Sequence, residues 1–233
     1  MRRLAAVATV TLLGGAVLPG CLIQPKADYQ PLAPGEKSRL DEAGQDRIKS
    51  SGHLRLDLSD LCLTVEEVGF PNPQLGSERF GTEDRDIEME LIGPHGTLQS
   101  FTRAVTIYPD ANAGRISMVE WFVSEDNAAE SRARLEADAA MLGLSDEVID
   151  GWSDWVEGVK TGEFENRLKV IGLGVSPTGF VMDIQGNYNA TTNNEVYIYA
   201  IYLNPAFNTP EVKAAWGDYP SEVEPVFDDD WTC

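Results

Sequence analysis

The segment Glu195-Val-Tyr-Ile-Tyr-Ala-Ile-Tyr-Leu203 decides the fold. Its β-branched and aromatic residues are apolar at both alternating positions, which is the pattern of a strand that is covered on both faces. Such a strand belongs in the middle of a sheet. Two further apolar runs precede it, at residues 167–175 and 180–187, and the sequences Pro177-Thr-Gly179 and 187–194 provide the turns between them. We therefore expect three consecutive strands in this half of the chain.

The preceding part of the chain predicts three more strands. Residues 87–91 alternate apolar and acidic side chains, as a half-buried strand does. Residues 98–108 and 116–123 are rich in Thr, Val, Ile and Phe, and they flank the turn-forming sequence Asp110-Ala-Asn-Ala-Gly114. This arrangement predicts a β-hairpin.

Helices are predicted at three places. Ser124 begins a helix that reaches Leu142 and stops at Gly143, and Ser145 begins a second, shorter one. Thr209-Pro210-Glu211 opens a third, with proline at the first helical position. The order of these elements predicts an α+β fold: a single domain with a largely antiparallel sheet of about six strands and helices packed on one face.

Composition limits the classes of function. The chain has 233 residues, of which 42% are hydrophobic, and 18 Lys and Arg oppose 38 Asp and Glu, so the net charge is −20. The length and apolar content suffice for one sizeable core. A protein that binds nucleic acid needs a basic surface, so the acidity argues against that partner.

The N-terminus has the pattern of an export signal. Arg2 and Arg3 precede the uncharged apolar stretch Leu4–Leu18. Fifteen residues are too short for a transmembrane span but suit the hydrophobic region of a signal peptide. It is also the only apolar run in the sequence that approaches membrane-spanning length, which excludes a polytopic membrane protein.

The residues that follow, Leu18-Pro19-Gly20-Cys21, resemble the lipobox of bacterial lipoprotein precursors, with Pro19 an uncommon second residue. The resemblance implies that residues 1–20 are a cleaved signal peptide and that Cys21 carries the lipid. The mature protein would then be anchored in the cell membrane and face its extracytoplasmic side. The alternatives are an ordinary secretory signal with a chance cysteine and an uncleaved anchor.

The next segment, residues 21–52, has the composition of a spacer. Pro25, Pro31 and Pro34 favour an extended chain, and Gly44 interrupts the only helical pattern. We therefore predict a lipidated N-terminus with a flexible tether at residues 21–52 and a single domain at residues 53–233.

Two cysteines remain besides Cys21. An exported protein is exposed to oxidising surroundings, so we predict a disulfide between Cys62 and Cys233. Two buried free thiols are the alternative. The segment Asp60–Glu67 also resembles the domain entry of some actinobacterial lipoproteins, which have Asp-x-Cys followed by Leu-Thr-x-Glu-Glu.

Signals for catalysis and metal binding are weak. The two histidines, His53 and His95, belong to no HExxH motif, and the sequence holds no GxSxG, SxxK or Walker pattern. Asp110-x-Asn112-x-Gly114 resembles the start of a calcium loop but lacks the later Glu, and Asp228–Asp230 reads as a solvated acidic run. We predict no catalytic residue, no metal site and no cofactor.

Trp152 and Trp155 are the best candidates for a contact surface, because they are neighbours on one helical face among acidic residues. The alternative is that both are core residues. We expect a non-enzymatic binding or accessory module of the cell envelope rather than an enzyme. Its partners would be the membrane, through Cys21, and an unknown protein or envelope ligand. That ligand would be basic, since signal cleavage lowers the net charge to −22. The alternative function is an envelope hydrolase acting on cell-wall or lipid substrates.

Overall fold

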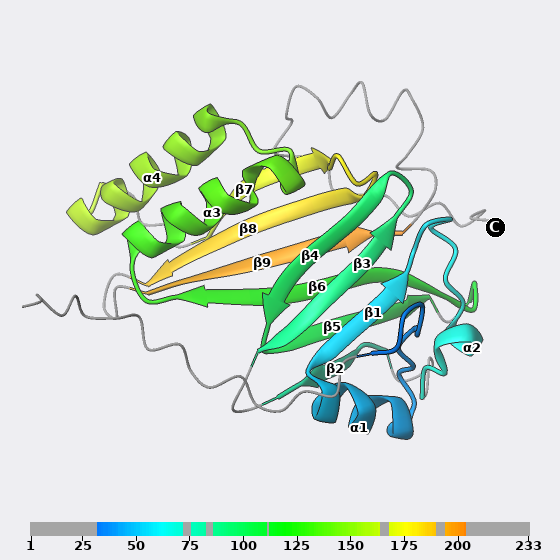
Figure 1. Cartoon of the computed structure of the whole chain (residues 1–233). Coiled ribbons are helices and arrows are strands. Elements are labelled where there is room, and N and C mark those ends of the chain that lie inside the picture. Colours follow the sequence, from blue (N-terminus) through cyan, green and yellow to red (C-terminus); the bar gives the residue numbers. More distant parts are fainter. Residues whose placement is uncertain are drawn as a thin grey trace, which may run out of the picture.

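The computed structural model describes residues 32–71, 76–82, 86–110, 112–163, 168–189 and 194–203. Figure 1 shows the helices and strands that these ranges form. The elements are α1 (Glu42–Ser51), β1 (His53–Asp57), α2 (Val65–Val68), β2 (Glu78–Gly81), β3 (Ile87–Gly93), β4 (Gly96–Thr102), β5 (Ala104–Asp110), β6 (Arg115–Glu125), α3 (Ala128–Leu142), α4 (Asp146–Thr161), β7 (Leu168–Val175), β8 (Val181–Asn189) and β9 (Asn194–Tyr202).

The larger sheet has six strands in the order β2-β5-β6-β9-β8-β7, and every neighbouring pair is antiparallel. The predicted central strand is β9, which lies between β6 and β8. Tyr197, Tyr199 and Ile201 are buried on one face of β9, and Ala200 and Tyr202 are buried on the other. The prediction of a strand covered on both faces is therefore confirmed.

A smaller sheet, which the sequence did not predict, has the order β1-β3-β4. β1 is parallel to β3, and β3 is antiparallel to β4. The single strand predicted at residues 98–108 is divided between the two sheets. The Thr102 hydroxyl accepts a hydrogen bond from the N–H of Ala104 and lies 2.7 Å from the carbonyl oxygen of Phe122. The chain bends at this point, so that β4 joins the small sheet and β5 the large one.

Both the helices α3 and α4 and the small sheet lie on the same face of the large sheet (Figure 1). The predicted α+β architecture, with helices on one face of a largely antiparallel sheet, is confirmed. The predicted helix boundaries are close: the N-cap of α3 is Asn127, three residues after the predicted Ser124, and the helix stops at Gly143, which has the left-handed conformation. Among the described residues, no helix is long and apolar enough to cross a membrane.

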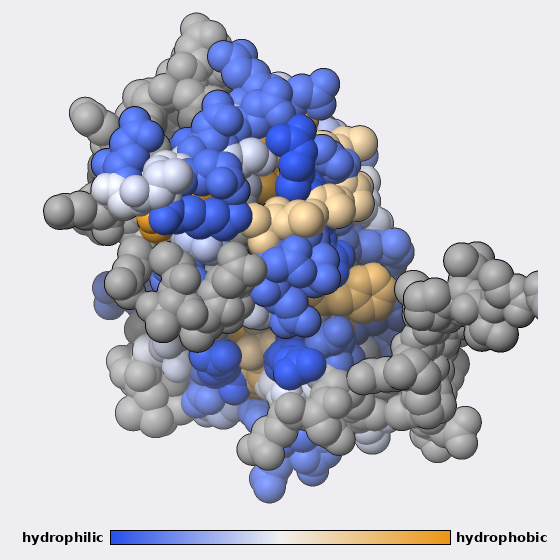
Figure 2. Space-filling model, turned by 90° about the vertical axis from the view of Figure 1, so that its left-hand side faces the viewer, coloured by the Kyte–Doolittle hydropathy of each residue, from blue (hydrophilic) through white to orange (hydrophobic). Residues whose placement is uncertain are grey.

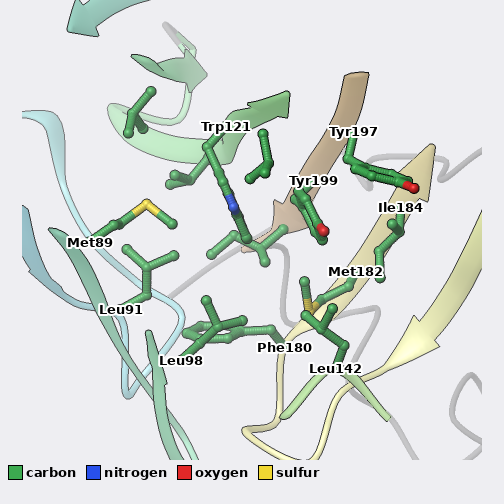
Figure 3. Close-up of a cluster of buried hydrophobic side chains, with 14 of the residues drawn as sticks. Met89, Leu91, Leu98, Trp121, Leu142, Phe180, Met182, Ile184, Tyr197 and Tyr199 are labelled. Carbon is green, nitrogen blue, oxygen red and sulfur yellow. The ribbon is translucent and has the colours of Figure 1, made fainter. Parts of the chain in front are cut away.

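The core between the layers is centred on two stacked rings (Figure 3). Trp121 of β6 lies opposite Tyr199 of β9, with ring centroids 5.2 Å apart and nearly parallel planes. The Trp121 Nε1–H donates a hydrogen bond to Ser100 Oγ of β4, 3.1 Å away, which ties the large sheet to the small one. Apolar side chains of the small sheet, of α3 and of β8 surround the rings: Met89, Leu91, Leu98, Leu142, Met182 and Ile184.

The folded domain begins before the predicted boundary at residue 53. Leu40 is fully buried and Ile48 of α1 is 2% exposed. Asp41 caps α1 by accepting a hydrogen bond from the N–H of Gly44. Gly44 lies inside α1 and does not interrupt the helix. Glycine is required at this position, because a side chain there would collide with the backbone of Arg39. The predicted tether is therefore wrong for its second part, and residues 21–31 lie outside the described residues.

Gly186 of β8 is required for the packing of α4 on the sheet. A Cβ atom at this position would collide with the ring of Trp152. We expect Gly186→Ala to lower the free energy of unfolding by about 1–3 kcal/mol, because the overlap forces the helix or the ring to move.

The matched control is Gly151→Ala in α4, where the nearest atom to an added Cβ is 3.9 Å away. Alanine is the better helix former, so this variant should gain up to about 1 kcal/mol. Urea unfolding monitored by Trp fluorescence measures both, and equal effects would contradict the packing argument.

Candidate functional site

Trp152 and Trp155 do not form an exposed contact surface. Trp152 is 1% exposed and Trp155 is 9% exposed, and their rings stack with centroids 4.9 Å apart. The Trp152 Nε1–H donates a hydrogen bond to the hydroxyl of Tyr197, 2.9 Å away. The prediction of a contact surface at Trp152 and Trp155 is wrong, because the missing side chain of Gly186 leaves a space on the sheet that Trp152 fills.

Two predicted site residues, Cys21 and Cys233, lie outside the described residues, as does the acidic run Asp228–Asp230. Lipid attachment at Cys21 and the pairing of Cys62 with Cys233 therefore stay predictions. Cys62 itself lies just before α2, and its N–H donates to Asp60 Oδ1. Thr64 and Glu67 form a capping box at the start of α2, on the segment that resembles a lipoprotein domain entry.

The two histidines and the calcium-like turn occupy ordinary structural positions. His53 Nδ1 lies 3.2 Å from a carboxylate oxygen of Glu88, and the N–H of His95 donates to the carbonyl of Thr178 in a turn. Asp110 Oδ1 accepts hydrogen bonds from the N–H groups of the following turn. Within the described ranges, no group of three or more His, Cys, Asp or Glu is arranged to hold a metal ion.

A pocket of about 360 Å³ lies where the two sheets diverge, next to the bend at Thr102. We call it the β6-end pocket. The end of β6 and the start of α3 lie at the left of Figure 1, and Figure 2 shows this side as mainly hydrophilic with small hydrophobic patches. The residues that line it come from strands β2, β4, β5 and β6, from the adjoining connections and from α3. They are Arg79, Asp86, Phe101, Thr102, Arg103, Ala104, Phe122, Val123, Ser124, Glu125, Asp126 and Arg134.

The apolar part of the β6-end pocket is aromatic. Phe101 is 50% exposed and is the one large hydrophobic residue that is exposed in the described part of the chain. It points outward because β4 alternates, with Leu98 and Thr102 turned toward the core. Phe122 lies beneath the guanidinium of Arg79, whose carbon is 5.2 Å from the ring centroid.

Three arginines line the pocket, and they differ in their partners. Arg103 Nε lies 3.4 Å from Asp86, and Arg134 Nε lies 3.0 Å from Glu125. Arg79 forms no ion pair with any carboxylate that the structure describes. Among the described residues, the one charged-group contact of the Arg79 guanidinium is thus with the aromatic ring of Phe122.

A second pocket of about 300 Å³ lies between β1 and α2 and contains Cys62. Its cations are neutralised: Lys37 Nζ lies 2.7 Å from Asp57, and Arg55 Nε lies 2.6 Å from Glu90. It has no exposed aromatic residue. It is therefore the weaker candidate for recognition of a ligand.

A pair of carboxylates lies on the opposite face of the large sheet. Asp183 of β8 and Glu120 of β6 both lie beside Ala200 of β9, so their Cα atoms are about 10 Å apart. Asp183 Oδ2 accepts a hydrogen bond from Gln185, but its Oδ1 is buried and has no hydrogen-bond partner among the described residues. Desolvation by burial raises the pKa of Asp183. The hydroxyl of Tyr108 donates to Glu120.

Comparison of the chain with protein-family models, with curated proteins and with solved structures finds no match. The functional argument therefore depends on the geometry of these sites.

The sequence contained one usable signal for the β6-end pocket. Phe101 stands among polar residues in the run Leu98-Gln-Ser-Phe-Thr102, at the position whose parity turns it away from the core. The guanidinium of Arg79 and the ring of Phe122 are 43 positions apart in the sequence and could be paired only through the register of β2, β5 and β6.

The raised pKa of Asp183 predicts a pH-dependent stability. Because the pKa of Asp183 is raised in the folded protein, the folded protein keeps the carboxyl proton at a pH at which the unfolded chain has lost it. The Asp183 carboxyl therefore lowers the free energy of unfolding as the pH rises above about 4. We expect Asp183→Asn to gain stability relative to the wild type, by an increasing amount between pH 4 and pH 7.

Urea unfolding across this pH range measures the difference. Glu163→Gln is the control, because Glu163 is exposed and lies outside both sites. A difference for Asp183→Asn that stays constant with pH would contradict a desolvated carboxyl.

Proposed function

We propose that the chain is a lipoprotein anchored on the extracytoplasmic side of the cell membrane. We propose further that it acts as a non-enzymatic binding or accessory module whose ligand occupies the β6-end pocket. The observation that carries the second part is that one pocket is lined both by the half-exposed ring of Phe101 and by the guanidinium of Arg79, which has no described carboxylate beside it. Aromatic residues and arginine are enriched where proteins contact their partners.

The energetics favour a ligand at this place. Covering the exposed half of Phe101 would contribute on the order of 1 kcal/mol. The ring already lies on a sheet strand, so little conformational freedom is lost on contact. The pocket volume also lies within the range of small-molecule sites.

The carboxylate pair supports the alternative, an envelope hydrolase. Glycosidases use two carboxyl groups about 5–10 Å apart, one of them with a raised pKa. Asp183 and Glu120 flank Ala200 on neighbouring strands, and burial raises the pKa of Asp183. The surroundings argue against it. Ala200 lies between the two residues and is 5% exposed, and Tyr202 beside them is 9% exposed, which leaves little room for a substrate. We therefore prefer the binding module.

A fragment screen by NMR on the full chain in detergent micelles tests the binding proposal. The library contains neutral, cationic and anionic aromatic fragments. We expect signals of the β6-end pocket to shift with at least one class, and Phe101→Ala to weaken this binding by at least about fivefold, because the apolar contact is lost.

Glu157→Ala in α4, remote from the pocket, is the matched control and should leave the affinities unchanged. If no class of fragment contacts the pocket, the binding proposal fails. Turnover of chromogenic glycosides or esters that disappears in both Asp183→Asn and Glu120→Gln would support the hydrolase instead.

The anchor is tested separately. Changing Cys21→Ser removes the thiol to which the lipid would be attached, and we expect the variant to incorporate no radiolabelled palmitate when it is expressed in bacteria. Cys62→Ser is the control and should be labelled as well as the wild type. Equal labelling of Cys21→Ser would exclude the lipoprotein assignment.

A further inference from the structure

We infer that the ligand of the β6-end pocket is an organic anion: a carboxylate or phosphate group bound to Arg79, joined to an apolar group that lies on Phe101. This inference rests on the proposed binding function and specifies the chemistry of its ligand. It departs from the expectation of a basic partner that net charge alone suggested.

The first reason is the state of Arg79. Its guanidinium has a ring on one side and no described carboxylate beside it. Arginine stays protonated at every physiological pH, so the positive charge is permanent. The ring of Phe122 occupies one side of the guanidinium, and no described group accepts a hydrogen bond from its N–H donors. Such a fork binds a carboxylate or phosphate through two parallel hydrogen bonds.

The second reason is the arrangement of the neighbouring charges. Arg103 and Asp86 form a pair at 3.4 Å with side chains 71% and 59% exposed, and such pairs contribute little. Arg103 can therefore turn toward an anion at Arg79 at small cost. The acidic groups Glu125 and Asp126 line the pocket at the end of β6, next to the start of α3. The anionic group is thus expected at the β2 side and the uncharged group elsewhere in the pocket.

The third reason is the size and polarity of the pocket. A volume of about 360 Å³ admits a small molecule or the end of a longer chain, but not a folded partner. Phe101 and Ala104 give it an apolar wall beside the arginines. An inorganic anion would use only the charged part, whereas an anion with an aromatic or aliphatic group would use both.

The test compares four probes of similar size on the full chain: benzoate, phenyl phosphate, benzyl alcohol and benzylammonium. Binding is measured by NMR titration at low and at moderate salt. We expect the two anions to bind at least about tenfold more tightly than the other two probes, and more weakly as salt is added. A preference for phenyl phosphate would indicate a phosphate ester as the natural ligand, and a preference for benzoate a carboxylate; either supports the inference.

Variants assign the effect to Arg79. Arg79→Gln should weaken anion binding at least about tenfold, and Arg79→Lys should weaken it less, because the charge stays while the fork is lost. Lys49→Gln, in α1 and outside the pocket, changes the net charge by the same amount and should have no effect. Arg79 is exposed, so these variants are expected to fold.

Two results separate the inference from the proposed function. If benzyl alcohol or benzylammonium binds the pocket as well as the anions do, or if Arg79→Gln leaves anion binding unchanged, the anion inference is overturned while the binding module stands. If none of the four probes contacts the pocket, and Phe101→Ala does not weaken the binding of any fragment, the anion inference and the binding proposal are both overturned.

Discussion

The stack of Trp121 on Tyr199 is the contact on which the rest of the structure depends. It joins β6 to β9 in the middle of the large sheet and presents a wide apolar surface on one face. No single element in the described chain covers that surface. The small sheet covers one part, through Met89, Leu91 and Leu98, and α3 and α4 cover another. Burial of this face therefore requires two covers of different kinds, the helices and a second, three-stranded sheet.

The β6-end pocket is a consequence of this double cover. The strand that would have continued from β4 into β5 bends at Thr102, because one half must join the small sheet and the other the large one. Where the layers diverge, side chains from four strands and from α3 meet without filling the space between them. Phe101 and Arg79 lie at this junction because of register, not because of any local motif.

The surroundings of the charged side chains are also set by the tertiary structure. Most described cations lie beside carboxylates, as expected in a chain with 18 basic and 38 acidic residues. Arg79 departs from this pattern, since its guanidinium contacts a ring. On the other face of the sheet, Asp183 keeps a buried oxygen without a partner, and desolvation raises its pKa. The buried oxygen of Asp183 costs stability, because it loses its water without gaining a described hydrogen-bond donor, whereas the exposed guanidinium of Arg79 stays solvated.

The sequence by itself determined the features that depend on neighbouring residues. These are the central strand at 195–203, the hairpin around 110–114, the stop of α3 at Gly143 and the start of α4 at Ser145, since alternation, turns and caps act over a few positions. The tertiary structure decided the rest. Whether Trp152 faced solvent depended on Gly186, in a strand that follows α4 in the chain. Whether residues 40–51 belonged to the domain depended on the surface offered by β1. The β6-end pocket depended on the register of strands distant in sequence, which composition and periodicity do not encode.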